Sequence, residues 1–540
     1  MSRLSRRQIL GGAAVTAAAV TLGAPSVHAQ KRGRALRFVA QADLKILDPV
    51  WTTAYITRNH GYLVYDTLFG TDEQQQIKPQ MIDRFTVSTD RMKYTFTLRD
   101  GLRWHDGQPV RSEDCVESLK RWGKKDRFGR LLMAHTGKIA SVDQKTFTIE
   151  LAERFGLVLD ALGKPSTNVP FMMPARIAAI SPDEQIKEVV GSGPFRFVRD
   201  EWQPGIVGEV WQPDNQVVYV RNPDYVPRNE APSGSTGGKR AYLDRVIWRY
   251  IPDNETAAAA LAAGEVDWWE IPPLDFLPKI EQNPALRTFV PDPLGTQGWL
   301  QPNHLHPPFN NRKAREALLH MMDQVTYLAL AIGQAKYYRP CHSVFACGGP
   351  YATTAGAEPM ITHDVARARQ LVKESGYDGR PVVVIHVTDL AHLNKAALVT
   401  RQRLEAIGFN VDLKAMNWAT ALAVRARKEP PNKGGWNVLH TWWLAHDVIN
   451  PAVHFGVSGA GAGAWFGWPD IPQLERLTID WVRATDLARR KQLADDIQKV
   501  ALGEVAYVPW GEWVWPTAFR KNVQGILKFT VPVFWNVTIS

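Results

Sequence analysis

The sequence predicts an α/β protein built from more than one domain. A chain of 540 residues, 45% of them hydrophobic, is too long for a single hydrophobic core. Short apolar runs with the spacing of strands alternate along it with amphipathic stretches long enough for helices. Some of these helices end at a glycine directly before the next strand, as in the short αβ connections of α/β folds.

The alternation can be followed along the chain. Gly376 and Gly408 each end a helical stretch, where a left-handed backbone conformation favours glycine. Residues 228–240 are rich in Pro, Gly and Ser and predict a surface loop. Helices are expected over 311–323, 362–375, 391–407 and 486–502, and strands over 147–151, 382–387 and 409–413.

Residues 94–122 predict a strand, two tight turns and a helix. Apolar and polar residues alternate over 94–98, which is the period of a half-buried strand. Asp-Gly pairs at 100–101 and 106–107 predict turns. Ser112, followed by two acidic residues, is expected to begin the helix.

This stretch, YTFTLRDGLRWHDGQPVRSEDCVESLKRW, resembles a sequence block of the family 5 solute-binding proteins, the peptide, nickel and oligosaccharide receptors of ABC importers. Other motifs resemble that family in the same order, and together they cover nearly all of the chain after its first thirty residues. On these matches the sequence is identified as a member of the family. The matching segments are 47–49, 64–68, 191–195, 221–225, 243–246, 262–267, 308–318 and 516–520.

The resemblance implies a class II periplasmic binding protein fold, with two lobes around a cleft and an added third domain. Crossings between the lobes are expected near 289–293 and 505–509, where they would act as a hinge that closes on the ligand. The implied order is a signal peptide over 1–29, the start of lobe I over 30–70, the added domain over 71–190, the lobe I sheet over 191–285, lobe II over 286–505 and a return to lobe I over 506–540.

The first 29 residues have the pattern of a secretory signal peptide. Basic residues precede an apolar stretch over 9–25, and small residues place a cleavage site near Ala29. Residues 5–10, SRRQIL, resemble the twin-arginine consensus, and the alternative is an ordinary secretory signal with two adjacent arginines. No cysteine follows the cleavage site, so no lipid anchor is expected. The mature protein is expected in the periplasm, and the resemblance implies a monomer.

The net positive charge of the chain does not indicate nucleic-acid binding. Removal of the signal peptide takes away three arginines and lowers the net charge from +10 to +7. Acidic residues are interspersed with basic ones, so a solvated basic surface is expected in an exported protein.

Cysteine usage predicts one disulfide bond. Cys341 and Cys347 lie six residues apart, and an oxidising compartment favours a small-loop disulfide over two free thiols. Such a short loop contributes about 2 kcal/mol to the free energy of unfolding. Cys115 lies on the helix that follows Ser112 and is expected to be a buried hydrophobic residue.

The sequence carries no signature of catalysis. HExxH, CxxC, GxxxxGK[ST] and GxSxG are all absent. His304 and His306 alternate, but no other His, Cys or Asp nearby completes a metal-ligand spacing. No enzyme, cofactor or metal is therefore predicted. An exported hydrolase of a glycoside or peptide, and a chemosensory protein on the same fold, remain as alternatives.

Tryptophans gather toward the end of the chain. Eleven of the twenty lie between Trp418 and Trp535. Trp442 and Trp443 are adjacent, and neighbouring residues of a strand point to opposite faces, so one of the two is expected to line the cleft. Trp465, in an irregular Gly-rich stretch, is expected there too.

The resemblance supplies further site residues. Residues 440–451 resemble the family region in which an Asp pairs with the amino group of a peptide ligand, but the tyrosine and a second Asp-Pro are missing. Asp447 is the remaining candidate to hold a cationic group. The full set of expected ligand-binding residues is Tyr55, Trp299, Trp418, Trp442, Trp443, Asp447 and Trp465.

The predicted function is capture of a small organic solute, peptide-like or aromatic and cationic, for an ABC importer. The expected partners are the permease and ATPase subunits, and the sequence does not name the solute.

Overall fold

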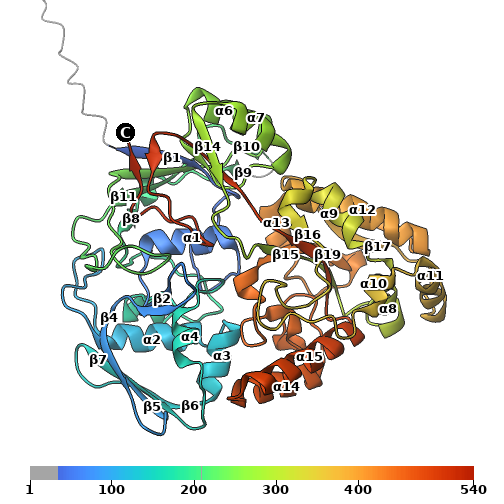
Figure 1. Cartoon of the computed structure of the whole chain (residues 1–540), viewed down its shortest axis with the longest axis horizontal. Coiled ribbons are helices and arrows are strands. Elements are labelled where there is room, and N and C mark those ends of the chain that lie inside the picture. Colours follow the sequence, from blue (N-terminus) through green and yellow to red (C-terminus); the bar gives the residue numbers. More distant parts are fainter. Residues whose placement is uncertain (1–33, 208–209) are drawn as a thin grey trace, which may run out of the picture. The chain divides into compact units, whose positions relative to one another are not determined.

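The computed structural model describes residues 34–207 and 210–540 (Figure 1). The predicted signal peptide over 1–29 lies outside the described residues. Within them, three larger sheets organise the chain. The blue to green segments and the dark red C-terminal segment form one group of elements, and the yellow to orange segments form another (Figure 1). We call residues 34–289 and 517–540 lobe I, and residues 296–513 lobe II.

The central sheet of lobe I has seven strands drawn from distant parts of the chain. β1 (Ala35–Val39) lies between β12 (Arg245–Arg249) and β13 (Trp268–Trp269) and pairs with both in parallel. Phe38 of β1 packs edge-on against Trp268 at 5.1 Å and against Phe534 at 5.0 Å, which fills the core below the sheet. In spatial order the strands are β14 (Leu286–Phe289), β21 (Thr517–Arg520), β13 (Trp268–Trp269), β1, β12 (Arg245–Arg249), β11 (Val217–Arg221) and β8 (Phe195–Phe197).

Helix α1 (Tyr55–Val64) is buried along its whole length. Its polar residues are satisfied inside the protein: the Asn59 amide donates to Glu270 Oε1 (2.9 Å), and the His60 ring shares a hydrogen bond with the Tyr219 hydroxyl (2.9 Å). A side chain at Gly61 would collide with the Phe171 ring. The helix therefore holds Tyr55, its first residue, in a fixed position.

A four-stranded antiparallel sheet forms the part of lobe I that the resemblance implies as the added domain. The predicted strand and helix of residues 94–122 are confirmed as β5 (Lys93–Leu98) and α2 (Ser112–Trp122), with Gly101 and Gly107 at positive φ in the turns between them. The elements are β4 (Ile82–Val87), β5, β7 (Thr146–Leu151) and β6 (Thr136–Ser141), with α2, α3 (Arg127–Ala134), α4 (Val158–Gly163) and α5 (Ala175–Ala178).

Helix α2 begins at Ser112, as predicted, and an acidic side chain of its first turn caps it. Ser112 is the first helical residue, and its hydroxyl bonds to the Asp143 carbonyl outside the helix. Arg111 is the N-cap, and its backbone N–H donates to the Asp114 carboxylate at 2.8 Å. Asp114, in the first turn, therefore caps the helix.

Lobe II is built on a six-stranded sheet. Four predicted helices are confirmed within two or three residues, as α8 (Arg312–Met321), α11 (Val365–Glu374), α12 (Ala391–Ile407) and α15 (Leu487–Gly503). Other helices are α9 (Gln324–Ala331), α10 (Glu358–Thr362), α13 (Trp418–Val424) and α14 (Pro472–Arg483). The sheet order is β16 (Tyr338–Arg339), β20 (Val508–Trp513), β15 (Thr296–Pro302), β19 (Val438–Leu444), β17 (Val382–Val387) and β18 (Val411–Met416).

The chain passes twice between the two large sheets. The first crossing, residues 290–295, joins β14 to β15 near the predicted position. The second, residues 514–516, joins β20 to β21 and comes later than the expected 505–509, because β20 still pairs with β15 in lobe II. The remaining elements are α6 (Asn254–Ala263), α7 (Leu277–Gln282) and the strand pairs β2 (Phe69–Thr71) with β3 (Ile77–Pro79), β9 (Ile206–Val207) with β10 (Val210–Trp211) and β22 (Val523–Gln524) with β23 (Thr538–Ile539).

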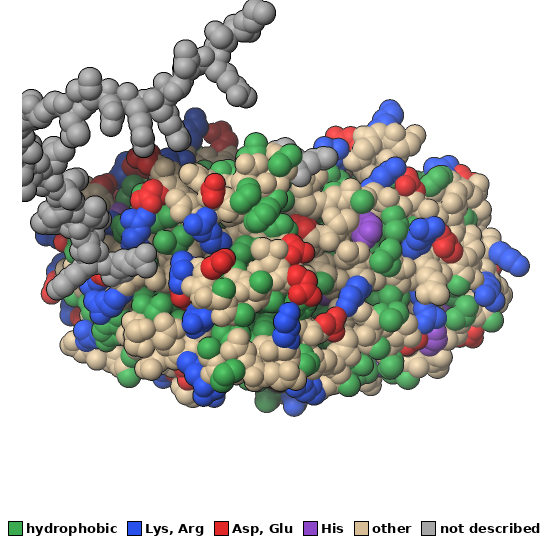
Figure 2. Space-filling model, turned by 90° about the horizontal axis from the view of Figure 1, so that it is seen from above, with side chains coloured by type: hydrophobic (Ala, Val, Ile, Leu, Met, Phe, Trp, Pro, Cys, Tyr) green, Lys and Arg blue, Asp and Glu red, His purple; other side chains and the backbone are tan. Residues whose placement is uncertain are grey.

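Charged side chains of both signs are mixed on the surface. On the face that Figure 2 shows, Lys and Arg lie among Asp and Glu, with apolar side chains between them. Within the described residues, no helix is both long enough and apolar enough to span a bilayer.

Candidate ligand-binding cleft

Three cavities between the lobes meet at Gln41 and Trp442. Counted as all space that atoms do not fill, open solvent included, their volumes are about 790, 670 and 350 Å³, and both residues line all three. Gln41 follows β1 of lobe I, whereas Trp442 lies in β19 of lobe II. Trp515, in the second crossing, lines the two larger cavities. We call the three cavities together the cleft.

Lobe I lines the 670 Å³ cavity with two buried, charged side chains, Arg58 and Glu270. Glu270 accepts hydrogen bonds from the Gln41 backbone N–H (2.8 Å) and the Asn59 amide (2.9 Å). Burial raises the pKa of Glu270 to about 7. A ligand cation beside this carboxyl group would favour its ionised form.

Arg58 is held by polar side chains and by an aromatic ring. Its guanidinium donates to Asn59 Oδ1 (2.7 Å) and Ser166 Oγ (2.7 Å) and lies 4.5 Å from the centre of the Tyr55 ring. Burial lowers the pKa of Arg58, while the nearby charges of Asp447 and Glu270 act in the opposite direction. The arginine therefore has carboxylates around it that compensate its charge.

Asp447 joins the two lobes. It ends the short 3₁₀ turn after β19, and its Oδ2 accepts hydrogen bonds from the Tyr55 hydroxyl (2.7 Å) and the Ser166 hydroxyl (3.0 Å). Its Oδ1 accepts one from the Thr167 backbone N–H (2.6 Å). The Tyr55 oxygen also accepts a hydrogen bond from the Leu444 N–H (2.7 Å). All three donors to Asp447 belong to lobe I, so this carboxylate connects the lobes at the edge of the cleft.

Aromatic rings form the lobe II wall of the cleft. Trp442 lies 5.1 Å from the Trp418 ring, 4.9 Å from the His392 ring and 6.1 Å from the Tyr55 ring. Trp418, Trp443 and Arg425 line the 350 Å³ cavity with Trp442. Such a wall can stack on a planar or apolar part of a ligand, while the charged groups opposite orient its polar ends.

The family profile named bacterial extracellular solute-binding proteins, family 5 middle, matches residues 76–459. The chain belongs to the family 5 solute-binding proteins. It is the substrate-binding component of an ABC importer.

Two relatives match nearly the full chain. The probable peptide ABC transporter periplasmic-binding protein y4tO of Sinorhizobium fredii (strain NBRC 101917 / NGR234) is 36% identical over 544 residues, which covers 99% of each chain. The glutathione-binding protein GsiB of Salmonella paratyphi A is 27% identical over 498 residues, covering 91% of this chain and 89% of the relative.

Solved structures share the fold. The periplasmic binding protein AgaA of A.tumefacien R10, in complex with agropinic acid, superposes with a TM-score of 0.77 at 22% identity, covering 94% of this chain and 99% of that one. DppA of Helicobacter pylori, in complex with the peptide STSA, gives 0.77 at 22% identity, covering 94% and 98%. The periplasmic binding protein fold class is thereby confirmed.

The family 5 fold brings four of the seven predicted site residues together. Tyr55, Trp418, Trp442 and Trp443 all line the 350 Å³ cavity. Trp442 and Trp443 also point to different sides of β19: Trp442 reaches all three cavities, whereas the Trp443 ring packs against Phe455 at 5.5 Å. Asp447 lies next to this group through its bond to Tyr55.

Trp299 is placed differently from its prediction. It is fully buried in lobe II and is not among the residues that line the cleft. Its ring stacks on Tyr507 at 4.1 Å, and its Nε1–H donates to Gln297 Oε1 at 2.9 Å. The reason is the strand register: Gln297 opposes Trp443, so Trp299, two residues further along β15, shares the Trp443 side of the sheet.

Trp465 also lies away from the three cavities. It lines a separate hollow with Trp51 and Phe466, and its ring packs edge-on against Trp443 at 5.3 Å. It therefore supports the aromatic wall from behind.

Several residues of the cleft were not predicted from the sequence. Asp267 ends the matching segment 262–267 and pairs with Arg37 at 2.8 Å, whereas Glu270, three residues later, lines the cleft. Gln41, Arg58 and Arg425 stand in no spacing pattern that distinguishes them from structural residues. Other unpredicted residues that line the cleft are Asn254, His392, Lys395 and Trp515.

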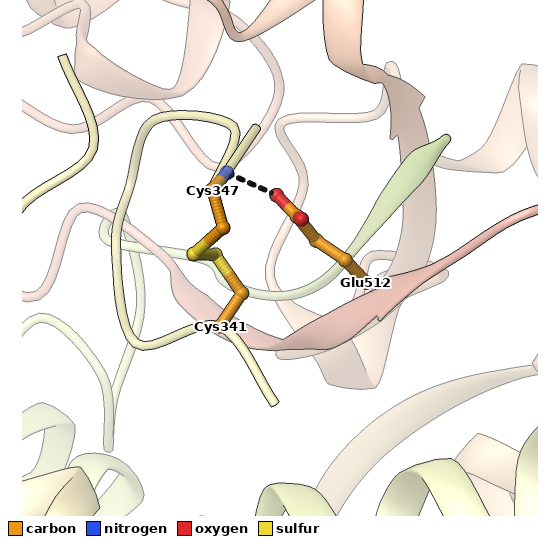
Figure 3. Close-up of side chains that lie close together, drawn as sticks. All are labelled: Cys341, Cys347 and Glu512. Atoms are coloured by element: carbon orange, nitrogen blue, oxygen red, sulfur yellow. Dashed lines mark hydrogen bonds between the residues drawn. A yellow bond between two sulfur atoms is a disulfide. The ribbon is translucent and has the colours of Figure 1, made fainter. Parts of the chain in front are cut away.

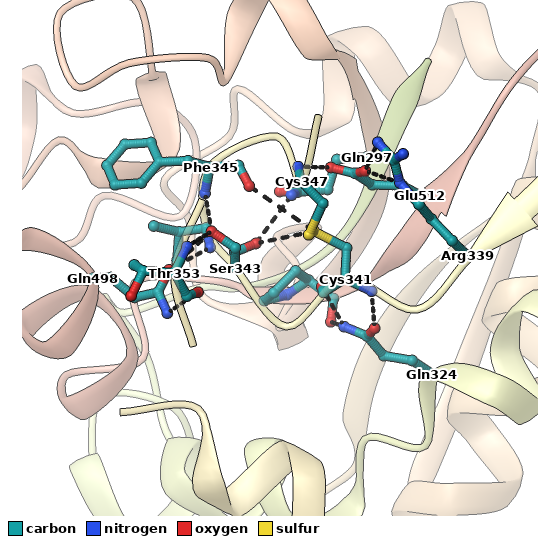
Figure 4. The surroundings of a disulfide bond; sticks show 12 residues. Gln297, Gln324, Arg339, Cys341, Ser343, Phe345, Cys347, Thr353, Gln498 and Glu512 are labelled. Carbon is teal, nitrogen blue, oxygen red and sulfur yellow. Dashed lines mark hydrogen bonds and ion pairs between the residues drawn. A yellow bond between two sulfur atoms is a disulfide. The ribbon is translucent and has the colours of Figure 1, made fainter. Parts of the chain in front are cut away.

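A disulfide joins Cys341 and Cys347, with an S–S distance of 2.03 Å (Figure 3). Glu512 of β20 accepts a hydrogen bond from the Cys347 N–H (2.8 Å) and pairs with Arg339, as Figure 4 shows. The three ligand-type atoms of the two cysteines and Glu512 lie within 4.8 Å of one another, but both sulfurs are used in the disulfide. Arg339 and Glu512 therefore help to fix the loop that the disulfide closes.

Proposed function

We propose that this family 5 protein captures a small peptide-like solute in the cleft and delivers it to the permease of its importer. The observation that supports the proposal is that three cavities meet at one residue of each lobe, with aromatic rings on one side and buried charged groups on the other. A zwitterionic solute with an apolar part matches this combination of groups. The name of the 36% identical relative, a probable peptide ABC transporter periplasmic-binding protein, agrees with it.

Capture would proceed by closure of the lobes. The two crossings at 290–295 and 514–516 carry the movement, and Asp447 with Tyr55 forms the contact that holds the closed form. Stacking on Trp442 and removal of water from the charged groups supply the affinity. The permease recognises the closed receptor, and the ATPase subunits supply the energy.

The location and assembly state belong to the same proposal. The chain is exported through the twin-arginine route, is cleaved near Ala29 and acts in the periplasm as a monomer without a membrane anchor. The mature protein needs no cofactor or metal and carries out no chemistry on its ligand.

Thermal unfolding of residues 30–540 against a ligand panel tests the function. The panel contains di- and oligopeptides, glutathione, sugars, aromatic acids, opines and nickel chelates. A ligand at a hundred times its Kd adds about 2.7 kcal/mol to the free energy of unfolding. We expect a midpoint shift of a few degrees with peptide-like compounds, which are recovered unchanged. A shift with sugars or chelates alone would contradict the proposed solute class, and recovery of a cleaved compound would indicate a hydrolase.

A further inference from the structure

Arg127 connects the four-stranded part of lobe I, residues 82–178, to lobe II. It is the first residue of α3, and its side chain is 3% exposed. Its guanidinium donates to Glu475 Oε1 and to the Thr478 hydroxyl, each at 3.2 Å, and both acceptors lie in α14. A longer bond of 3.4 Å reaches the Pro451 carbonyl, also in lobe II. All side-chain hydrogen bonds that Arg127 makes to described residues therefore cross from one lobe to the other.

The start of α3 is fixed within lobe I. Its N-cap, Asp126, accepts a hydrogen bond from the Gly129 N–H at 2.8 Å. The Lys164 ammonium pairs with the same carboxylate, and both side chains are buried. The backbone of Arg127, the next residue, is therefore held at a defined place from which the guanidinium reaches lobe II.

Glu475 receives Arg127 together with two donors of its own lobe. Its Oε1 also accepts hydrogen bonds from the Ser458 hydroxyl (3.0 Å) and the Gly459 N–H (2.8 Å). Burial acts to raise the pKa of Glu475, but the charge of Arg127 and the Gly459 N–H outweigh it, so the pKa lies below its ordinary value. The ionised carboxylate is therefore favoured opposite the arginine.

The same carboxylate anchors a loop behind the aromatic wall of the cleft. We call residues 458–466, which begin at Ser458 and are rich in glycine, the wall loop. Trp465 of this loop packs edge-on against Trp443 at 5.3 Å, and Trp443 lines the 350 Å³ cavity. A contact made at Glu475 is therefore connected to the cleft through the wall loop.

The contact lies at the end of the lobes away from the crossings. Figure 1 shows α3 beside α14 at the lower edge of the view, whereas β14, from which the first crossing leaves lobe I, lies near the top. The second crossing leads to β21, which pairs with β14. When two lobes turn about a hinge, the points farthest from it move most, so a bond at this end opposes opening with the longest lever arm.

We propose that the four-stranded part of lobe I acts as a clasp: Arg127 holds Glu475 when the lobes close and thereby orders the wall loop behind the cleft. The inference rests on the proposed function, because closure of the lobes is part of it. Arg127 lines none of the three cavities of the cleft, so it is a positioning residue that acts through the wall loop. Ser166 and Thr167, which donate to Asp447, belong to the same part of lobe I and form a second contact of the clasp.

Variants of the mature protein test the clasp. They are Arg127→Gln, Arg127→Lys and Glu475→Gln. The matched controls are Arg483→Gln and Glu153→Gln, because these two residues pair at 2.6 Å between the same two parts of the protein but are 54% and 57% exposed. Small-angle scattering gives the radius of gyration, and hydrogen exchange gives the protection of the wall loop. Both are measured without ligand and with the best ligand of the panel at saturation.

We expect Arg127→Gln and Glu475→Gln to increase the radius of gyration and to speed exchange in the wall loop by about tenfold, because the loop loses a charged anchor. Arg127→Lys, which keeps the charge, should restore part of the protection. Arg127→Gln should also weaken ligand binding by about tenfold, because closure contributes to affinity. The two control variants should leave all three quantities unchanged, since exposed ion pairs contribute little.

Two outcomes would overturn the clasp. One is a radius and a wall-loop exchange rate in Arg127→Gln equal to those of the wild type. The other is faster exchange throughout the protein with no excess in the wall loop, which would show that Arg127 only supports the fold; Arg127→Lys and Glu475→Gln decide the matter if Arg127→Gln does not fold. Failure of every ligand of the panel to bind would count against the proposed function, and the ligand-free comparison would still decide the inference.

Discussion

Asp447 and Arg425 are both buried charged residues of lobe II that face lobe I, but the protein surrounds them differently. The Asp447 carboxylate accepts three hydrogen bonds of 2.6 to 3.0 Å from lobe I, and Arg58 lies nearby. The Arg425 guanidinium makes a single long bond to Thr53 and otherwise lies among rings. The Asp447 charge is bonded across the lobes, whereas the Arg425 charge has no carboxylate partner among the described residues.

The difference changes how the cleft is understood. The resemblance assigns Asp447 to the amino group of a ligand, yet its two oxygens already have donors from lobe I. Glu270 is the buried carboxyl group of lobe I that lines the 670 Å³ cavity, together with Arg58. The two carboxyl groups therefore differ in their surroundings: Asp447 is bonded to lobe I, whereas Glu270 lines a cavity of the cleft.

The largest effect is expected for Asp447→Ala. The change leaves the Tyr55 hydroxyl, the Ser166 hydroxyl and the Thr167 N–H without their acceptor, and it removes a charge that compensates Arg58. Loss of one partner of a buried charged network costs about 3 to 5 kcal/mol. Chemical denaturation should show this loss, and small-angle scattering should show a larger radius of gyration because the lobes separate.

Asp66→Ala is the matched control for lobe separation. Asp66 is equally buried and pairs with Lys239 at 2.8 Å and with the Tyr225 hydroxyl at 2.9 Å, all within lobe I. It should lower the free energy of unfolding without changing the radius of gyration of the folded protein. An unchanged radius for Asp447→Ala as well would contradict the role of Asp447 in joining the lobes.

Glu270 gives the next largest effect, as a dependence on pH. Its pKa in the folded protein is about 7, compared with an ordinary value of 4.5. The folded state therefore favours the protonated form, and this contribution is present below pH 4.5 and is lost as the pH rises through 7. Relative to the wild type, Glu270→Gln should gain about 3 kcal/mol of unfolding free energy between pH 4 and pH 8. Glu265→Gln, an exposed change in the same segment, should show no such gain, and a constant difference for Glu270→Gln would refute the account.

A more local effect separates the two adjacent tryptophans. Trp442→Ala should weaken binding of the best ligand of the panel by about ten- to a hundredfold, because it removes the ring that all three cavities share. Trp443→Ala should instead lower the free energy of unfolding, because Trp443 packs against Trp299 at 5.1 Å in lobe II. Calorimetry and thermal unfolding measure the two outcomes. Equal effects of both variants on both quantities would contradict the view that Trp442 is the main cleft ring and that Trp443, which borders only the 350 Å³ cavity, mainly supports the core of lobe II.

The sequence predicts the scaffold better than the cleft. Helices and strands depend on neighbouring residues, whereas the cleft depends on contacts between residues far apart along the chain. Strands and helices such as β5 and α12 follow from local period and from glycine at helix ends. The contact between Tyr55 and Asp447 joins residues 392 positions apart, and no local pattern indicates it. The side to which Trp299 points depends on its register with β19, which a single strand does not reveal. The surroundings of Arg425, which has no carboxylate partner among the described residues, likewise depend on contacts between distant segments.

The smallest effect is expected for Tyr55→Phe, which removes one hydroxyl from the contact between the lobes. That oxygen donates to Asp447 and accepts from the Leu444 N–H, so the variant leaves one buried N–H without a partner and should lose about 1 to 2 kcal/mol. Tyr507→Phe is the control, since its hydroxyl is equally buried but bonds to Gln297 and Val344 within lobe II. Both variants should unfold at lower denaturant concentration, but only Tyr55→Phe should shift the radius of gyration toward that of Asp447→Ala. If Tyr55→Phe left the lobes as close as in Tyr507→Phe, Ser166 and Thr167 alone would hold Asp447, and the lobe contact would lie in the 166–167 loop.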